Sequence, residues 1–320
     1  MGQKLAGWKG KLLSLGGKEI LIKAVAQAIP SYTMSCFQLP QGLCEDLESM
    51  MRRFWWGQKY QEAKMALVGW KQMCVSKSRG GMGFRNLQAF NLAMLVKQAW
   101  RILTNPNSLI ACVLKARYFP TGDILSTSLS SSPSYSWRSI FNSLCVIRKG
   151  SRWRVGNGKQ IHIWEDKWLP TPSTHKVISP PTSIPNFPMV SSLIDTDTKG
   201  WRSEMIRSTF LPFEADVILK IPLSRSLPDD KLIWMGNKRG EFTVRSVYHL
   251  AIAWLNQRQK RKALMEIHLN PFGRTYGASN FLLRLRYLFG GLVSMGCLLG
   301  TRFALVASLP TLNVPFVERF

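Results

Sequence analysis

Apolar side chains recur at three- and four-residue steps through much of the amino-terminal half of the chain, and this is the spacing of one α-helix face. The pattern is clearest in 86–105, where Lys97 and Arg101 lie outside an apolar face made of Leu87, Phe90, Ala93, Val96, Trp100 and Leu103. The segments 18–29 and 41–56 repeat it, and a further helix is expected at 108–118. The chain is therefore expected to be mostly helical.

Proline, glycine and serine interrupt this pattern and mark the expected connections. An extended segment and a tight glycine turn are predicted in 66–84, and the Ser/Pro-rich 120–136 indicates a loop. Six prolines between 170 and 188 exclude a regular element there. Between these loops, 152–156 and 159–164 flank Gly156-Asn157-Gly158, which predicts a β-hairpin.

The segment from about 190 to 254 is expected to be ordered. Helices are predicted near 200–209 and 213–219, with a strand pair turning at 237–240 and a helix beginning in 244–254. The whole pattern predicts a predominantly α-helical α+β fold. It would comprise a helical amino-terminal unit, a Trp-rich middle with a hairpin, and a small, partial carboxy-terminal domain.

The charge of the chain is strongly unbalanced. Its 43 Lys and Arg residues oppose 18 Asp and Glu residues, which gives a net charge of +25 and a pI near 10.3. Such a field attracts nucleic acid or anionic lipid and makes the binding sensitive to salt. The excess is spread along the chain rather than confined to one tail, so a generally basic soluble protein is the alternative interpretation.

In four places the cations stand beside aromatic rings. A ring can stack on an unpaired base while a cation neutralises a phosphate, a combination typical of single-stranded nucleic-acid binding. The alternative is that the rings are core anchors and their basic neighbours face water. The predicted nucleic-acid-binding residues are Lys9, Lys11, Arg52, Arg53, Lys115, Arg117, Arg152, Trp153 and Arg154.

The residue pattern does not indicate a catalytic site or a metal site. Asp229-Asp230 is the one adjacent carboxylate pair, but it follows Leu227-Pro228 and indicates a turn before a strand rather than a Mg²⁺ site. The six cysteines form no C-x-x-C pair, and the four histidines are far apart. We expect no cofactor and no small-molecule substrate. The uncharged run 287–301 is shorter than the roughly 20 residues that cross a bilayer, so a membrane helix is not expected.

Several ordered motifs resemble those of plant LINE-type (non-LTR) retrotransposon reverse-transcriptase proteins. They are GWKGKLLSLGGKEILIKAVAQAIPSYTMSCFQLP, FWWG, KARYFP, SRWRVGNGKQIHIWEDKWLP and GEFTVRSVYHLA, and they cover about residues 1–254. The resemblance implies a thumb-like helical region at 1–57, a helical linker region at 58–119, a loop, hairpin and Pro-rich connection at 120–188, and the start of a reverse-transcriptase zinc-binding domain at 189–254. Residues 255–320 depart from the family and resemble a degenerate or frameshifted tail.

The family's aromatic-Ala-Asp-Asp polymerase turn and the later Cys/His zinc ligands do not occur in this chain. The resemblance therefore implies a non-catalytic remnant that retains sequence-independent RNA or DNA binding through phosphate contacts, in the nucleus if it follows the family. The alternative is a helical protein-interaction module with a generally basic surface and no nucleic-acid role. A membrane-associated protein anchored through 287–301 is a third, weaker hypothesis.

Overall fold

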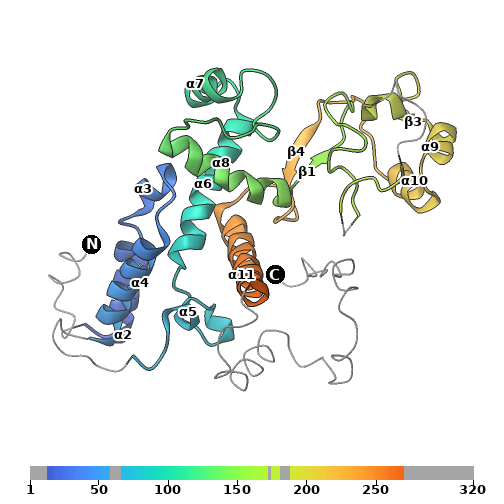
Figure 1. The fold of residues 1–320 in the computed structure, drawn as a ribbon. Coiled ribbons are helices and arrows are strands. Elements are labelled where there is room, and N and C mark those ends of the chain that lie inside the picture. The colour runs from blue at the N-terminus through green and yellow to red at the C-terminus, as the bar shows by residue number, and fades with distance from the viewer. Residues whose placement is uncertain (1–12, 58–65, 172–173, 181–187, 270–320) are drawn as a thin grey trace. The chain divides into compact units, whose positions relative to one another are not determined.

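The computed structural model of the chain describes residues 13–57, 66–171, 174–180 and 188–269 (Figure 1). The chain forms two units, 1–258 and 259–320, and in the second unit only the last turns of a helix are described. The fold is predominantly helical with short strands, so the predicted α+β class is confirmed. None of the helices in the described part is long and apolar enough to cross a membrane, and the run 287–301 lies outside the described residues.

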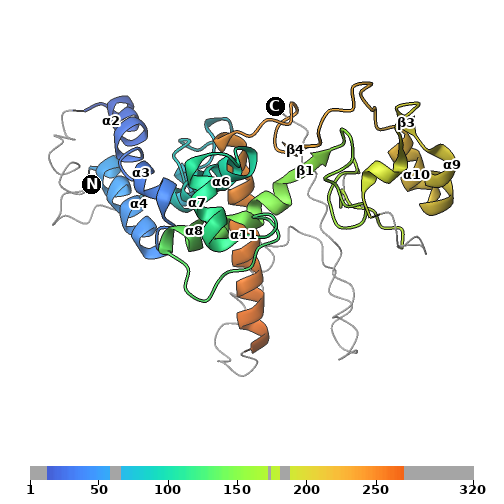
Figure 2. The ribbon, with the colours of Figure 1, turned by 90° about the horizontal axis from the view of Figure 1, so that it is seen from above.

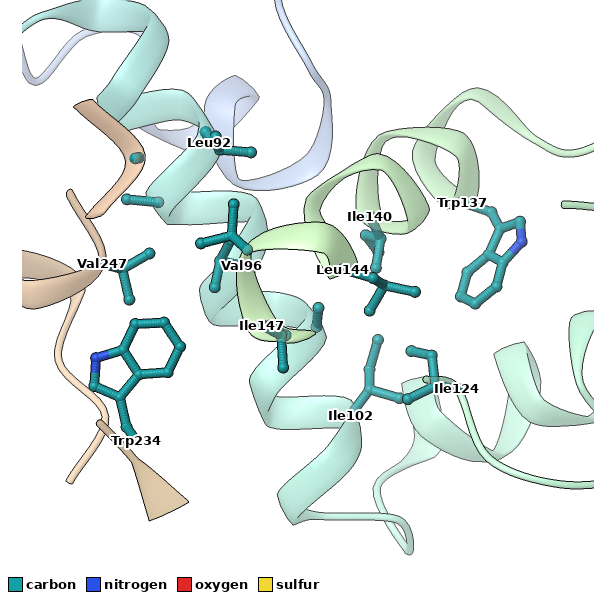
Figure 3. Packing of buried hydrophobic residues seen from close by; sticks show 14 of the residues in the cluster. Leu92, Val96, Ile102, Ile124, Trp137, Ile140, Leu144, Ile147, Trp234 and Val247 are labelled. Carbon is teal, nitrogen blue, oxygen red and sulfur yellow. The ribbon is translucent and has the colours of Figure 1, made fainter. Parts of the chain in front are cut away.

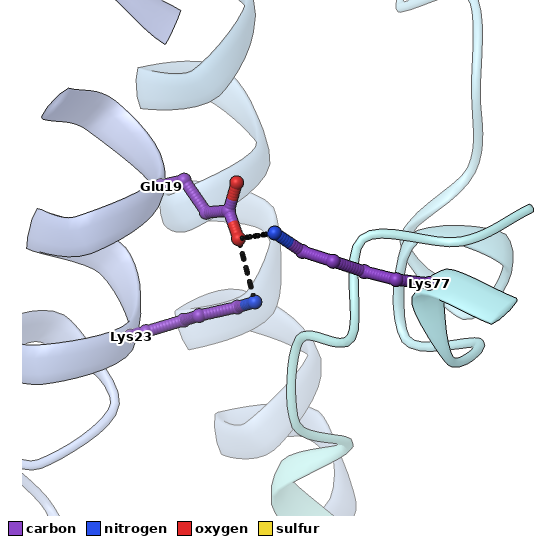
Figure 4. A network of polar contacts seen from close by, with 3 residues as sticks. All are labelled: Glu19, Lys23 and Lys77. Atoms are coloured by element: carbon purple, nitrogen blue, oxygen red, sulfur yellow. Dashed lines mark hydrogen bonds and ion pairs between the residues drawn. The ribbon is translucent and has the colours of Figure 1, made fainter. Parts of the chain in front are cut away.

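The amino-terminal helices pack around one apolar cluster. The elements are α2 (Leu15–Leu21), the π-helix η2 (Ile22–Ala26), α3 (Ser31–Cys36), α4 (Gln41–Trp56), α5 (Trp70–Met73) and the 3₁₀ turn η3 (Lys77–Arg79). The helices η2, α3, α4 and α5 contribute apolar side chains, and the amino-terminal cluster is Ile22, Ala26, Met34, Cys44, Met51, Trp55, Trp70, Met73, Phe84 and Leu87. On the surface, Glu19 accepts from the ammonium groups of Lys23 and Lys77, each at 2.7 Å (Figure 4). Those two bonds lower the pKa of Glu19.

A second cluster forms where three longer helices meet. They are α6 (Leu87–Thr104), α7 (Leu109–Tyr118) and α8 (Tyr135–Gly150). Figure 3 shows side chains from α6 and α8 packed with Ile124, from the connection between α7 and α8, and with Trp234 and Val247, which come from distant parts of the chain. Trp137 is fully buried, and the rings of Tyr118 and Phe119 stack on it. Burying a side chain of this kind contributes about 1.5–3 kcal/mol, so α8 anchors α7 and the loop that follows it.

The carboxy-terminal half of the first unit is built on short strands. Its elements are β1 (Ser151–Arg154), η4 (Val190–Leu193), β2 (Ile194–Asp195), β3 (Gly200–Trp201), α9 (Ser203–Thr209), α10 (Pro212–Leu219), β4 (Lys231–Trp234) and the part of α11 (Val244–Leu269) that ends at residue 258. Strand β1 continues directly from α8 (Figure 2) and pairs antiparallel with β4, Ser151 facing Trp234. Gly150 stands at that junction because a Cβ there would collide with the Trp234 ring. A third apolar cluster, which includes Ile161, Trp168, Leu169, Val190, Ile206 and Ile218, fills this half.

The predicted hairpin is wrong. Strand β1 pairs with Lys231–Trp234, some eighty positions later, and not with 159–164. The carboxylate of Asp230 accepts from the backbone N–H groups of Gly156, Gly158 and Gln160 at 2.7–2.9 Å, and these bonds hold the glycine turn open against β4. His162, in the expected second strand, instead makes a single bridge to Met189.

Other differences follow from tertiary context. The helix α8 was not predicted, and the extended segment expected in 66–84 contains the short helices α5 and η3. A turn forms at 237–240, but within the described residues β4 pairs with β1 and the expected strand pair is absent. The helices predicted at 41–56, 86–105, 108–118, 200–209 and 213–219 are confirmed within a few residues at their ends. The division of the chain into five regions stays a prediction.

Candidate nucleic-acid interface

The predicted binding residues lie on three separate elements. Arg52 and Arg53 are on α4, Lys115 and Arg117 are on α7, and Arg152, Trp153 and Arg154 form most of β1. Lys9 and Lys11 lie outside the described residues. The cations among them reach the surface, with Arg53, Lys115, Arg117 and Arg154 exposed and Arg52 and Arg152 half-buried.

The rings beside these cations turn inward. Trp55 belongs to the amino-terminal cluster and packs edge-on against Phe84, with ring centroids 5.6 Å apart. In β1, successive side chains point to opposite faces, so Trp153 lies on the other face of the strand from Arg152 and Arg154. Trp153 packs against the third cluster. The interleaving of rings and cations in the sequence therefore becomes a separation of rings from cations in the structure.

Around the junction of α8 with β1, the fold gathers cations from five segments. The set is Arg148, Lys149, Arg152, Lys167, Lys176 and Arg258, and it is called the basic cluster below. The N–H of Trp153 donates to the carbonyl oxygen of Lys167 at 2.7 Å, which fixes Lys167 beside β1. The Lys167 ammonium in turn donates to the Arg148 carbonyl at 2.7 Å, at the carboxyl end of α8 where helix carbonyls lack helical partners.

The electrostatics show that these charges lie within reach of one another. The pKa of Lys167 is lowered by burial and then by the charges of Lys176 and Lys149. Burial raises the pKa of the Cys145 thiol, and the charges of Lys149, Arg258 and Arg148 oppose that rise. Like charges are therefore held together, at a cost to folding that an anion placed among them would relieve.

His175 borders the basic cluster, and Arg152 is its member in β1. The pKa of His175 is lowered by burial and by the charges of Arg152 and Lys167, against a hydrogen bond between its Nδ1 and the Leu169 carbonyl. Burial lowers the pKa of Arg152, and its buried Nε has no hydrogen-bond partner.

Carboxylates do not neutralise this surface. Within the described part of the chain the ion pairs are Glu19 with Lys23, Glu19 with Lys77, and Arg207 with Asp216, none of which involves the basic cluster. Asp166 is adjacent to Lys167 in sequence, yet its carboxylate accepts from the backbone N–H of His162 at 2.7 Å.

Among the described residues, no group of three or more His, Cys, Asp or Glu side chains is arranged to hold a metal ion. Asp230 is buried, and its carboxylate oxygens accept hydrogen bonds from three backbone N–H groups. This agrees with the interpretation of Asp229-Asp230 as part of a turn. Its neighbour Asp229 is exposed and accepts from the side-chain amide of Asn157 at 2.9 Å. This carboxylate pair organises a loop.

The chain is 40% identical over 143 residues to the uncharacterized mitochondrial protein AtMg00310 of Arabidopsis thaliana, a match that covers 44% of this chain and 93% of that protein. The chain belongs to the AtMg00310 family. It is also 31% identical over 256 residues to the putative ribonuclease H protein At1g65750 of the same plant, covering 77% of this chain and 40% of that protein. These relatives support a retrotransposon-related plant protein at a coarse level. No protein-family model and no solved structure matches the chain.

For this member of the AtMg00310 family, sequence reasoning identified Arg152 but missed the rest of the basic cluster. Arg148 and Lys149 could have been found, because two cations in the last turn are typical of a helix carboxyl end. Lys167 and Lys176 carry no local signal, and Arg258 stands in a run of cations that does not by itself indicate β1, since the hydrogen bonds and helix packing that bring these residues to β1 are tertiary.

Proposed function

We propose that the chain is a non-catalytic remnant of a LINE-type reverse-transcriptase protein that binds RNA or DNA without sequence preference, through phosphate contacts made by the basic cluster. The observation that carries the proposal is the gathering of six cations, from five chain segments, without an ion-paired carboxylate. A surface of this kind binds a polyanion by releasing its counterions. It offers no arrangement for reading base edges.

The expected salt dependence follows from the number of cations. If each of the six neutralises one phosphate, the slope of log K against log salt on duplex DNA is about −5, and this is the steepest slope that the basic cluster can give. Raising the salt from 50 to 200 mM would then weaken binding by about 10³-fold. A smaller set of contacts would give a proportionally shallower slope.

The test compares two variants that lose the same charge. In the first, the exposed cluster residues Lys149, Lys176 and Arg258 become Gln. In the second, the exposed residues Lys220, Lys238 and Arg225 become Gln, which lowers the net charge equally elsewhere in the fold. We expect the first variant to lose most of its affinity for a mixed-sequence oligonucleotide, with a slope shallower by up to about 3, while the second stays near wild type. Equal weakening would mean that net charge alone accounts for binding.

The absence of catalysis belongs to the same proposal. The polymerase carboxylates of the LINE-type proteins are missing from the sequence, and Asp230 is committed to the loop at Gly156. Two-metal phosphoryl transfer needs carboxylates that are free to bind Mg²⁺. Magnesium-dependent nucleotide incorporation or RNA cleavage by the purified chain, abolished in an Asp229→Asn variant, would contradict the proposal.

One observation favours the second candidate, a protein-interaction module. The outer face of α7 exposes Leu109 and Val113, at 81% and 57%, and Arg117, four residues after Val113, continues the same face at its carboxyl end. An apolar stripe that ends in a cation suits an amphipathic partner helix with an acidic end. Binding of a synthetic helical peptide of that design, lost in Leu109→Ser/Val113→Ser and unaffected by the basic-cluster variant, would support this role. Failure to bind at high micromolar concentration would refute it.

A further inference from the structure

We infer that the basic cluster recognises the phosphate backbone of a double helix and prefers it to a single strand of the same length. This inference rests on the proposed function and specifies its substrate. It departs from the expectation raised by the sequence, where rings beside cations favoured single strands. The reason is the location of the rings once the chain has folded.

Every tryptophan in the described part of the chain is buried or half-buried, and the half-buried ones near the basic cluster have partners. Trp153 points to the opposite face of β1 from the two arginines. Trp164 donates to the Ser179 carbonyl and packs near Phe210. Trp254 is covered by the guanidinium of Arg258, which lies 5.3 Å from its ring centroid. No open ring is left among these tryptophans on which an unpaired base could stack.

The exposed aromatic residues of the described part are Tyr32, Tyr135 and Phe213. Tyr135 begins α8 while Arg148 and Lys149 end it, so about 20 Å of helix separates that ring from these cations at 1.5 Å per residue. Its ring also packs on Phe37, and its hydroxyl donates to the Gln38 carbonyl at 2.6 Å. Tyr32 and Phe213 lie on α3 and α10, outside the segments that supply the basic cluster.

A binding site that lacks stacking platforms depends on phosphate contacts alone. Single-strand binders combine a basic groove with rings, and much of their affinity comes from stacking. A duplex carries its charges more densely, so each contact releases about 0.9 counterion, against about 0.7 on a single strand. Over six contacts the slopes of log K against log salt therefore differ by roughly 1.2. Lowering the salt from 1 M to 0.1 M then raises the affinity for the duplex about 15-fold more than the affinity for the single strand.

The experiment measures binding of the full chain to fluorescently labelled 20-nucleotide RNA and DNA. Each oligonucleotide is tested as a single strand without internal pairing and as a duplex, between 50 and 300 mM salt. We expect the duplex to bind about 10-fold tighter near 0.1 M, with a steeper salt slope. We also expect single strands to leave tryptophan fluorescence nearly unchanged, since stacking on an indole quenches its emission.

The outcomes separate the inference from the function on which it rests. Single strands that bind as tightly as duplexes, or that quench tryptophan emission, would overturn the duplex preference while nucleic-acid binding stood. If the Lys149, Lys176 and Arg258 variant abolished that single-strand binding too, the basic cluster would remain the site with the wrong substrate assigned to it. If neither form bound at 50 mM salt, the proposed function would fail together with the inference.

Discussion

The loop around Gly156 gives the sharpest test of how this fold is held together. Asp230 is 8% exposed, and its two carboxylate oxygens accept from the N–H groups of Gly156, Gly158 and Gln160. Replacing Asp230 with Ala removes both acceptor oxygens and so all three hydrogen bonds at once, and the bonds of Gly156 and Gly158 are buried. A buried donor left without a partner costs about 1–3 kcal/mol. With two such donors, we expect Asp230→Ala to lower the free energy of unfolding by about 3–5 kcal/mol.

The isosteric Asp230→Asn variant should fall between that value and wild type. An Asn carbonyl can still accept from Gly156 and Gly158, since both bond to the same oxygen, Oδ1. The amide nitrogen would then face the N–H of Gln160 in place of Oδ2, so one bond is lost and two donors oppose each other. We expect a loss of about 1.5–3 kcal/mol, the contribution of one hydrogen bond to a charged group.

Urea unfolding followed by tryptophan fluorescence measures these differences, and the adjacent Asp229 supplies the control. Asp229 is exposed and makes one side-chain bond, to Asn157, so Asp229→Ala should cost no more than about 0.5 kcal/mol. Equal losses for Asp229→Ala and Asp230→Ala would refute the assignment of the buried carboxylate to the loop. Stabilisation of wild type by millimolar Mg²⁺, abolished by either substitution, would show instead that the two acids hold a metal.

Three further predictions concern backbone packing, pH and a long-range contact. Gly156→Ala should destabilise the chain by about 1–3 kcal/mol in urea titrations, because the new Cβ would collide with the backbone of Pro228 and Asp229, in the turn that precedes β4. The control is Gly42→Ala, whose Cβ would meet open space and which should stabilise α4 by up to about 1 kcal/mol. Because the folded pKa of His175 lies below its ordinary value near 6.5, the unfolded chain takes up a proton first as the pH falls; the free energy of unfolding should therefore decline below about pH 6.5 and be unaffected above it. A His175→Asn variant, which tolerates the left-handed backbone at that position, should lose this part of the decline between pH 7.5 and 5.5. Tyr248→Phe deprives the N–H of Asn86 of its acceptor at 2.9 Å and should cost about 1–3 kcal/mol by thermal or urea unfolding, and full stability in this variant would show that water replaces the hydroxyl.

The parts of the fold that sequence reasoning predicted are those that local spacing determines. The helix α6 keeps one apolar face through five turns, and Asn86 caps it by accepting from the N–H of Ala89. Its bounds were predicted within a residue or two. The helix α8 carries an equally regular stripe, with Trp137, Ile140, Leu144 and Ile147 buried and Ser134 as its cap. It was missed because the Ser/Pro-rich loop before it obscured the start signal.

The prediction of the strands was wrong for a different reason. The glycine turn at 156–158 is a real turn, but a turn signal identifies a hairpin only when the flanking segments pair with each other. Here Asp230, more than seventy positions away, occupies the N–H groups that a hairpin would have used. Pairing of β1 with β4 is a contact of high sequence separation, and nothing within a local window encodes it.

The same distinction governs the candidate site. Charge and ring composition predicted a binding site at β1, and this stays a prediction; proximity in sequence gave the wrong geometry for its rings and cations. In an extended strand, neighbours at one step face opposite sides, so Arg152-Trp153-Arg154 places its cations together and its ring apart from them. In the sequence this run suggests a surface on which bases could stack. In the strand, its two arginines share one face and its tryptophan packs against the apolar cluster on the other. On this reasoning the tryptophans of this chain hold the fold together, and the nucleic-acid binding that we propose would depend on the cations of the basic cluster, which have no carboxylate ion partner. Because those charges repel one another, a bound duplex should stabilise the fold most at low salt, where both the repulsion and its relief are largest.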